Sequence, residues 1–132
     1  MIVVDASVVV DFVLGLPPHG ERIADRLEAE APGIISPHLV DAEVAQVVRR
    51  YVLLGDVTIA YAESVLDDLA ALPMTRYPHG PLLRRAFELR DNATIYDALY
   101  VALAEATDAP LLTRDAALGR LPGHGATVEV IG

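Results

Sequence analysis

The chain has 132 residues, 53% of them hydrophobic, and a formal net charge of −9, so we expect one folded domain over residues 1–132. The absence of cysteine excludes disulfides and thiolate zinc sites, and the absence of lysine excludes Walker-type phosphate loops and Schiff bases. No signal-peptide pattern is visible, and no apolar run approaches the roughly 18 residues of a membrane span. We therefore expect a cytoplasmic protein that does not bind membranes.

The chain begins with a predicted strand that passes into a helix. Ile2 to Val4 form a short apolar run that ends at Asp5, and a second apolar segment extends from Val8 to Leu16. Asp5 therefore stands at the carboxyl end of a strand, where ligands bind in open α/β sheets. A helix N-cap is an equally good interpretation of Asp5 from this segment alone.

A helix, a strand and a further helix are expected next. Residues 19–30 have the pattern of a charged amphipathic helix, and residues 33–35 that of a short strand. Ser36 and Pro37 resemble an N-cap followed by proline in the first helical turn, so the next helix is expected to start there and to run to Gly55.

This helix carries two acidic residues beside its apolar stripe, Asp41 and Glu43. They flank the stripe on opposite sides, so the periodicity does not choose between them as a functional residue. A solvated position at the edge of the stripe is the simpler interpretation of each.

The middle of the chain predicts an amphipathic helix over residues 58–72, an edge strand over 74–77 and a short helix over 81–89. A strongly apolar helix follows over residues 94–106. Thr94 is its expected N-cap, and Asp97 stands three residues later, at the spacing of a capping box. Helix capping alone would explain Asp97.

The C-terminal part predicts a third buried strand, which ends at Thr113 and leads through Arg114 and Asp115 into a brief helix over residues 116–121. A last strand is expected over residues 127–131. This alternation of short strands and helices indicates an α/β fold with a central, mainly parallel sheet flanked by helices.

Four acidic residues stand at comparable places in these elements. Asp5 and Asp115 follow strands, whereas Glu43 and Asp97 lie on helices beside apolar faces. Parallel strands bring their carboxyl ends to one edge, and carboxylates about 4 Å apart repel by about 4 kcal/mol at an effective dielectric constant near 20. A folded protein accommodates such a cluster by protonation or by binding a cation, and oxygen ligands suit Mg²⁺ or Mn²⁺. Phosphodiester hydrolysis is the natural chemistry of such a site.

Four segments carry a resemblance to a known family, in its order and at its usual spacing: Val4–Ser7, Ser36–Val44, Tyr96–Ala104 and Leu111–Asp115. They resemble the motifs of PIN-domain ribonucleases, specifically the VapC-type toxins of toxin–antitoxin pairs. The resemblance covers nearly the whole chain and implies a PIN-like three-layer fold.

The resemblance also assigns roles to residues. Asp5, Glu43, Asp97 and Asp115 match the family's catalytic, metal-binding acids, which implies Mg²⁺ or Mn²⁺ as cofactor and favours Glu43 over Asp41. Two hydroxyl residues beside the first and last acids match supporting positions that hydrogen-bond a carboxylate or a water of the site, although local backbone capping explains them nearly as well. These are Ser7 and Thr113, and the neighbouring Arg114 is a candidate for contact with the substrate.

The implied function is a divalent-metal-dependent endoribonuclease that hydrolyses RNA phosphodiesters with a metal-activated water. By resemblance it would act as a toxin restrained by a cognate VapB-like antitoxin. It would also form a homodimer, with the first helix and the helix over 58–72 as candidate partner surfaces. The alternative is a catalytically silent PIN-fold module for protein–protein interaction, against which the four intact acids argue. A phospho-acceptor receiver domain is disfavoured because the chain lacks lysine.

Overall fold

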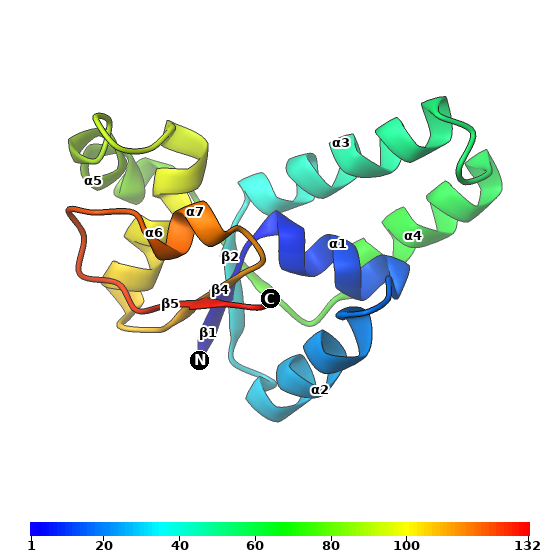
Figure 1. Ribbon diagram of the computed structural model, residues 1–132, viewed down its shortest axis with the longest axis horizontal. Helices are drawn as coiled ribbons and strands as arrows, with labels where there is room; N and C mark the ends of the chain where they lie inside the picture. Colours follow the sequence, from blue (N-terminus) through cyan, green and yellow to red (C-terminus); the bar gives the residue numbers. More distant parts are fainter.

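The computed structural model describes residues 1–132 and contains a single five-stranded sheet with the strand order β3-β2-β1-β4-β5. Every pair of neighbouring strands is parallel, so the predicted mainly parallel sheet is entirely parallel (Figure 1). The strands are β1 (Ile2–Val4), β2 (Ile34–Pro37), β3 (Thr75–Tyr77), β4 (Leu111–Thr113) and β5 (Val128–Val130).

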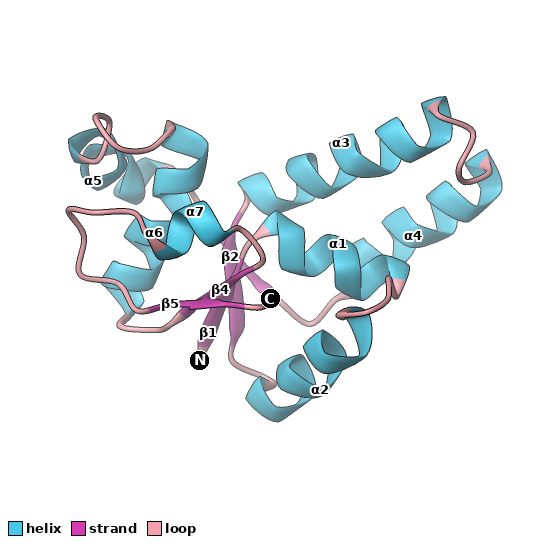
Figure 2. Cartoon of the chain, in the orientation of Figure 1, coloured by secondary structure: helices cyan, strands magenta, loops and turns pink.

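Helices cover both faces of this sheet, which confirms the expected three-layer α/β architecture (Figures 1 and 2). Helices α1 to α4 lie on one side, and α5 to α7 lie on the other. None of them has the length and apolarity needed to cross a membrane. The helices are α1 (Ala6–Leu14), α2 (Gly20–Glu30), α3 (Leu39–Leu53), α4 (Ile59–Ala71), α5 (Leu83–Glu88), which the 3₁₀ turn η1 (Gly80–Leu82) precedes, α6 (Ile95–Thr107) and α7 (Ala116–Gly119).

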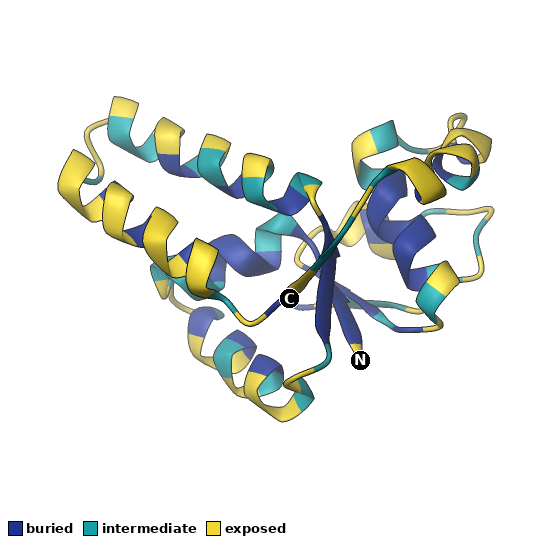
Figure 3. Ribbon diagram, turned by 180° about the vertical axis from the view of Figure 1, so that it is seen from behind, coloured by how far each residue is buried: buried dark blue, intermediate teal, exposed yellow.

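The core is one continuous cluster of 32 buried hydrophobic residues centred on β1 and α6. All three residues of β1 are fully buried, and α6 is buried from Ala98 to Ala104 because the sheet covers one side of it and α5 another. Figure 3 shows this pattern, with buried residues in the sheet and exposed residues along the outer side of α4. A core of this kind holds the ends of β1 and β4 rigidly in place.

The prediction that Ser36 and Pro37 begin a helix is wrong. Both residues belong to β2, and the buried Ser36 hydroxyl donates a hydrogen bond of 2.7 Å to the carbonyl oxygen of Val4 in the adjacent strand. Helix α3 begins at Leu39, whose N–H donates to Nε2 of His79 at 2.9 Å. The cap of this helix therefore comes from a residue 40 positions later, which local sequence does not reveal.

Arg76 on the edge strand β3 joins three elements. Its guanidinium donates to the carboxylate of Asp41 at 3.0 Å and to the carbonyl oxygens of Leu69, Leu72 and Met74. The last carbonyl groups of α4 thus gain a cationic partner, as the dipole of a helix end favours. Asp41 is engaged in this contact, which leaves Glu43 as the acid of α3 that faces the carboxyl ends of the strands.

Replacing Arg76 with alanine is expected to lower the free energy of unfolding by about 2–3 kcal/mol, because a carboxylate and three partly buried carbonyl groups lose a charged donor. Chemical denaturation monitored by circular dichroism measures this loss. Arg84 is exposed and makes no side-chain hydrogen bond, so Arg84→Ala is the matched control, with a change within about 0.5 kcal/mol. Equal effects of the two substitutions would contradict the role given to Arg76.

Candidate active site

Asp5 is a buried carboxylate at the junction of β1 and α1, with only 6% of its surface exposed. One oxygen accepts from the N–H of Val8 at 3.2 Å and from the hydroxyl of Ser7 at 2.5 Å, and the other accepts from the hydroxyl of Thr113. Burial raises the pKa of Asp5, these hydrogen bonds oppose that shift, and the negative charge of Glu43 adds to it. Asp5 is therefore both the N-cap of α1 and a member of a charged cluster.

The two hydroxyl residues join the carboxyl ends of β1 and β4. Besides contacting Asp5, the Thr113 hydroxyl accepts from the N–H of Asp115 at 3.0 Å, and the Ser7 hydroxyl accepts from the N–H of Arg114 at 3.0 Å. The loop that carries Arg114 and Asp115 is thus fixed to the start of α1. The structure places Ser7 and Thr113 where they orient the Asp5 carboxylate, as well as in local backbone contacts.

Glu43 is held by a residue that sequence reasoning did not assign to the site. The hydroxyl of Tyr100 donates to Oε1 of Glu43 at 2.5 Å, although Tyr100 is only 2% exposed and lies deep in α6. Burial, and then the contact with Glu43, raise the pKa of Tyr100 well above its ordinary value, so the phenol stays a hydrogen-bond donor. In the sequence, Tyr100 is simply one more apolar residue of a core helix.

Asp97 and Asp115 form the second half of the acidic cluster. Asp97 lies in the first turn of α6, where its N–H donates to the Thr94 hydroxyl at 3.2 Å while its carboxylate accepts no hydrogen bond. Burial raises the pKa of Asp97, and the nearby charge of Asp115 raises it further. Asp115 is exposed and accepts from the N–H of Ala117 at 2.9 Å as the cap of α7.

The acids affect one another in two pairs, Asp5 with Glu43 and Asp97 with Asp115. The negative charge of Glu43 raises the pKa of Asp5, and that of Asp115 raises the pKa of Asp97. The pKa of Tyr100 is raised by the charges of Glu43, Asp5 and Asp97. No three acidic or histidine side chains lie close enough in this arrangement to enclose one ion. Their carboxylate oxygens are nevertheless the ligand type of hard divalent cations, and Asp97 has no partner that prevents it from turning.

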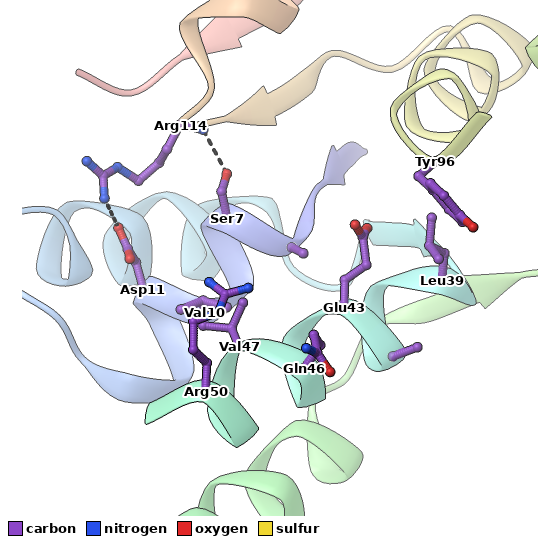
Figure 4. A pocket seen from close by; sticks show the side chains of 12 residues that line it. Ser7, Val10, Asp11, Leu39, Glu43, Gln46, Val47, Arg50, Tyr96 and Arg114 are labelled. Atoms are coloured by element: carbon purple, nitrogen blue, oxygen red, sulfur yellow. Dashed lines mark hydrogen bonds and ion pairs between the residues drawn. The ribbon is translucent and has the colours of Figure 1, made fainter. Parts of the chain in front are cut away.

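A cleft of about 590 Å³ opens beside this cluster, between α1 and α3 (Figure 4). Glu43 and Ser7 lie in its wall, so the cleft reaches the acidic cluster at those two residues, whereas the other three acids do not line it. Val10 and Val47 give it an apolar lining, and Arg50 and Arg114 add two cationic groups.

Arg114 lies at one end of the cleft and forms an ion pair with Asp11 of α1. Its Nη1 donates to Oδ2 of Asp11 at 2.6 Å, and Asp11 is only 5% exposed. The sequence reading included Asp11 in an apolar helix and assigned it no role. A lone acid in such a segment must find a cationic partner when buried, which is the clue that the sequence offers.

Comparison with known proteins places this geometry in a family. The model of the PIN domain matches residues 2–123. Ribonuclease VapC1 of Mycobacterium tuberculosis is 42% identical over 130 residues, which cover 98% of this chain and 96% of VapC1. Ribonuclease VapC12 of the same organism is 36% identical over 131 residues, which cover 99% of both chains.

The fold has a matching solved structure. VapBC2 from Rickettsia felis, bound to a DNA fragment from its promoter, superposes with a TM-score of 0.75 over 100% of both chains, at 19% sequence identity. The chain therefore belongs to the PIN domain family, in its VapC branch.

Replacing Asp97 with asparagine is expected to raise the melting temperature of the metal-free protein at pH 7, by at most a few degrees. Because the pKa of Asp97 is raised on folding, the folded state binds this proton more tightly than the unfolded chain. The carboxylate therefore costs stability above the raised pKa, and this cost vanishes below the ordinary value of 3.8. The difference between variant and parent should accordingly shrink as the pH falls towards 4.

Thermal unfolding in EDTA, followed by circular dichroism at pH 7 and near pH 4, measures the difference in melting temperature between variant and parent. Asp68→Asn on the exposed side of α4 is the control, with no expected gain. A melting temperature of Asp97→Asn at or below that of the parent at pH 7 would show that Asp97 is not under repulsion.

Proposed function

We propose that this chain is a divalent-metal-dependent endoribonuclease, acting as one domain and as the toxin of a toxin–antitoxin pair in the cytoplasm. The observation that carries the proposal is that Asp5 and Asp115 follow the neighbouring parallel strands β1 and β4, that Glu43 and Asp97 lie near the starts of α3 and α6, and that Glu43 lines an open cleft. Membership of the PIN family and a 42% identical relative named ribonuclease VapC1 support the same chemistry.

The residues proposed to hold Mg²⁺ or Mn²⁺ are Asp5, Glu43, Asp97 and Asp115. When bound, a divalent cation supplies an activated water and neutralises charge that develops on the phosphate. Asp5 is ready for this role because its orientation is already fixed by three donors. Asp97 and Asp115 lack such tertiary hydrogen bonds and would complete the ligand set by turning inward.

The remaining groups position these acids and the substrate. Tyr100 fixes one oxygen of Glu43, and Thr113 fixes one oxygen of Asp5. The chain carries a net charge of −9, so the whole molecule does not attract RNA. Contact with phosphates would depend on the arginines that line the cleft, Arg114 and Arg50.

An antitoxin of the VapB kind and a second copy of the chain are the proposed partners. The similar structure from Rickettsia felis is of VapBC2, which supports an antitoxin as partner. Helix α4 leaves Ile59, Tyr61 and Leu66 exposed, an apolar surface that a protein partner would cover. Helix α1, the other candidate surface, buries Val8, Val9 and Val10 in the core and leaves Phe12, Val13 and Leu14 only partly buried.

Asp5→Asn and Asp97→Asn are each expected to lower RNA cleavage by about 100-fold or more, because each removes a carboxylate charge that the bound cation needs. The measurement is cleavage of a mixed-sequence RNA in Mg²⁺, in Mn²⁺ and in EDTA, with the products expected to carry 5′-phosphate ends. Asp67→Asn, on the exposed side of α4, is the control and should retain full activity. A folded parent protein that cleaves no RNA in either metal would instead favour the silent interaction module.

Tyr100→Phe is expected to weaken Mn²⁺ binding and to lower cleavage by about tenfold, because Glu43 loses the donor that orients it. Calorimetric titration with Mn²⁺ measures the affinity, and circular dichroism separates this effect from a loss of folding. Tyr61→Phe is the matched control because Tyr61 is exposed on α4. Unchanged Mn²⁺ affinity in Tyr100→Phe would place Tyr100 in the core alone.

A further inference from the structure

Asp11 is a buried carboxylate with a single cationic partner. It lies on α1 among buried valines, and its only side-chain hydrogen bond is the one it accepts from Arg114. Replacing a buried ion pair with apolar residues is often neutral or stabilising, so such a pair is weak evidence of a stabilising role. What the pair does achieve is to join α1 to the loop between β4 and α7, directly beside Asp115.

Arg114 is held at both ends by α1. Its backbone N–H donates to the Ser7 hydroxyl at 3.0 Å, and its Nη1 donates to Asp11 at 2.6 Å. The guanidinium makes no other hydrogen bond and its side chain is 35% exposed, so four of its five N–H donors have no protein partner. A guanidinium fixed in one orientation with free donors is suited to bind a phosphate oxygen.

The position of Arg114 in the cleft indicates which phosphate that would be. In Figure 4 its guanidinium and the Glu43 carboxylate lie on opposite sides of the view, with Ser7 between them. Both side chains line the same cleft. A strand whose reacting phosphate lies at the acidic cluster would therefore extend a neighbouring phosphate towards Arg114.

We propose that Asp11 is a positioning residue, which holds Arg114 at the end of the cleft away from Glu43, where it binds the phosphate next to the one that is cleaved. This inference rests on the proposed ribonuclease function and adds the residue pair that places the RNA strand. Arg50 lines the same cleft, but no side chain of the protein holds its guanidinium. Orientation by Asp11 is thus what distinguishes Arg114.

The test measures binding of a short single-stranded RNA that the parent protein cleaves at one mapped position, with EDTA present to prevent cleavage. Arg114→Ala should weaken binding about tenfold and reduce the salt dependence, log Kd against log [salt], by about 0.7, the contribution of one phosphate on a single strand. Asp11→Asn should weaken binding several-fold, and should add nothing in an Arg114→Ala background. In Mg²⁺, both variants should raise KM more than they lower kcat.

Two controls and one modified RNA sharpen this test. Arg120→Ala and Asp68→Asn remove the same charges at exposed positions outside the cleft and should bind like the parent. Two RNAs carry a neutral methylphosphonate next to the cleavage site, one on its 5′ side and one on its 3′ side. One of the two should bind the parent and Arg114→Ala with equal affinity. In the parent, the NMR signal of the Arg114 Nε–H group should shift with natural RNA but not with that modified RNA, a measurement that requires no variant.

Three results would overturn the inference. Tighter binding by Asp11→Asn would mean that Asp11 competes with RNA for Arg114. Additive effects of the two substitutions would make Asp11 merely structural, and parent-like binding by Arg114→Ala would remove Arg114 from the RNA contact. Failure of the proposed function is distinguishable, because the parent itself would then cleave no RNA.

Discussion

The hydrogen bonding of the buried Asp5 carboxylate is the constraint on which the site depends. Its donors come from α1 and from β4, two elements that are more than a hundred residues apart in sequence. A buried carboxylate is tolerated only with such partners, so the same contacts that make Asp5 acceptable also fix the spacing between the two strand ends. The loop with Arg114 and Asp115 inherits its position from this arrangement.

The site consists of a rigid part and an adaptable part. Asp5 and Glu43 are fixed by hydroxyl donors, from Ser7 and Thr113 in one case and from Tyr100 in the other. Asp97 and Asp115 have no donor from a distant segment, and burial of Asp97 together with the nearby charge of Asp115 is a cost that a bound cation would relieve. Such a division would combine an oriented set of ligands with room for a cation to enter.

The sequence predicted the layer architecture because strand–helix alternation and parallel pairing follow from local patterns, and the convergence of the four acids remains a prediction. It did not predict contacts that join distant segments. Ser36 is a residue type that often caps helices, yet its hydroxyl donates a hydrogen bond to Val4 of the neighbouring strand β1. Tyr100 and Asp11 were counted as parts of apolar helices, because only the folded chain brings them to Glu43 and Arg114. The resemblance, rather than the periodicity, favoured Glu43, and the structure supplies a reason in the ion pair that engages Asp41.

The central claim is that these carboxylates converge to bind a divalent cation. The most direct measurement is anomalous diffraction from crystals of the parent protein grown with Mn²⁺. We expect an anomalous peak bounded by Asp5 and Glu43, with Asp97 turned towards it. A peak absent from this edge of the sheet, in crystals that bind Mn²⁺ elsewhere, would contradict the account.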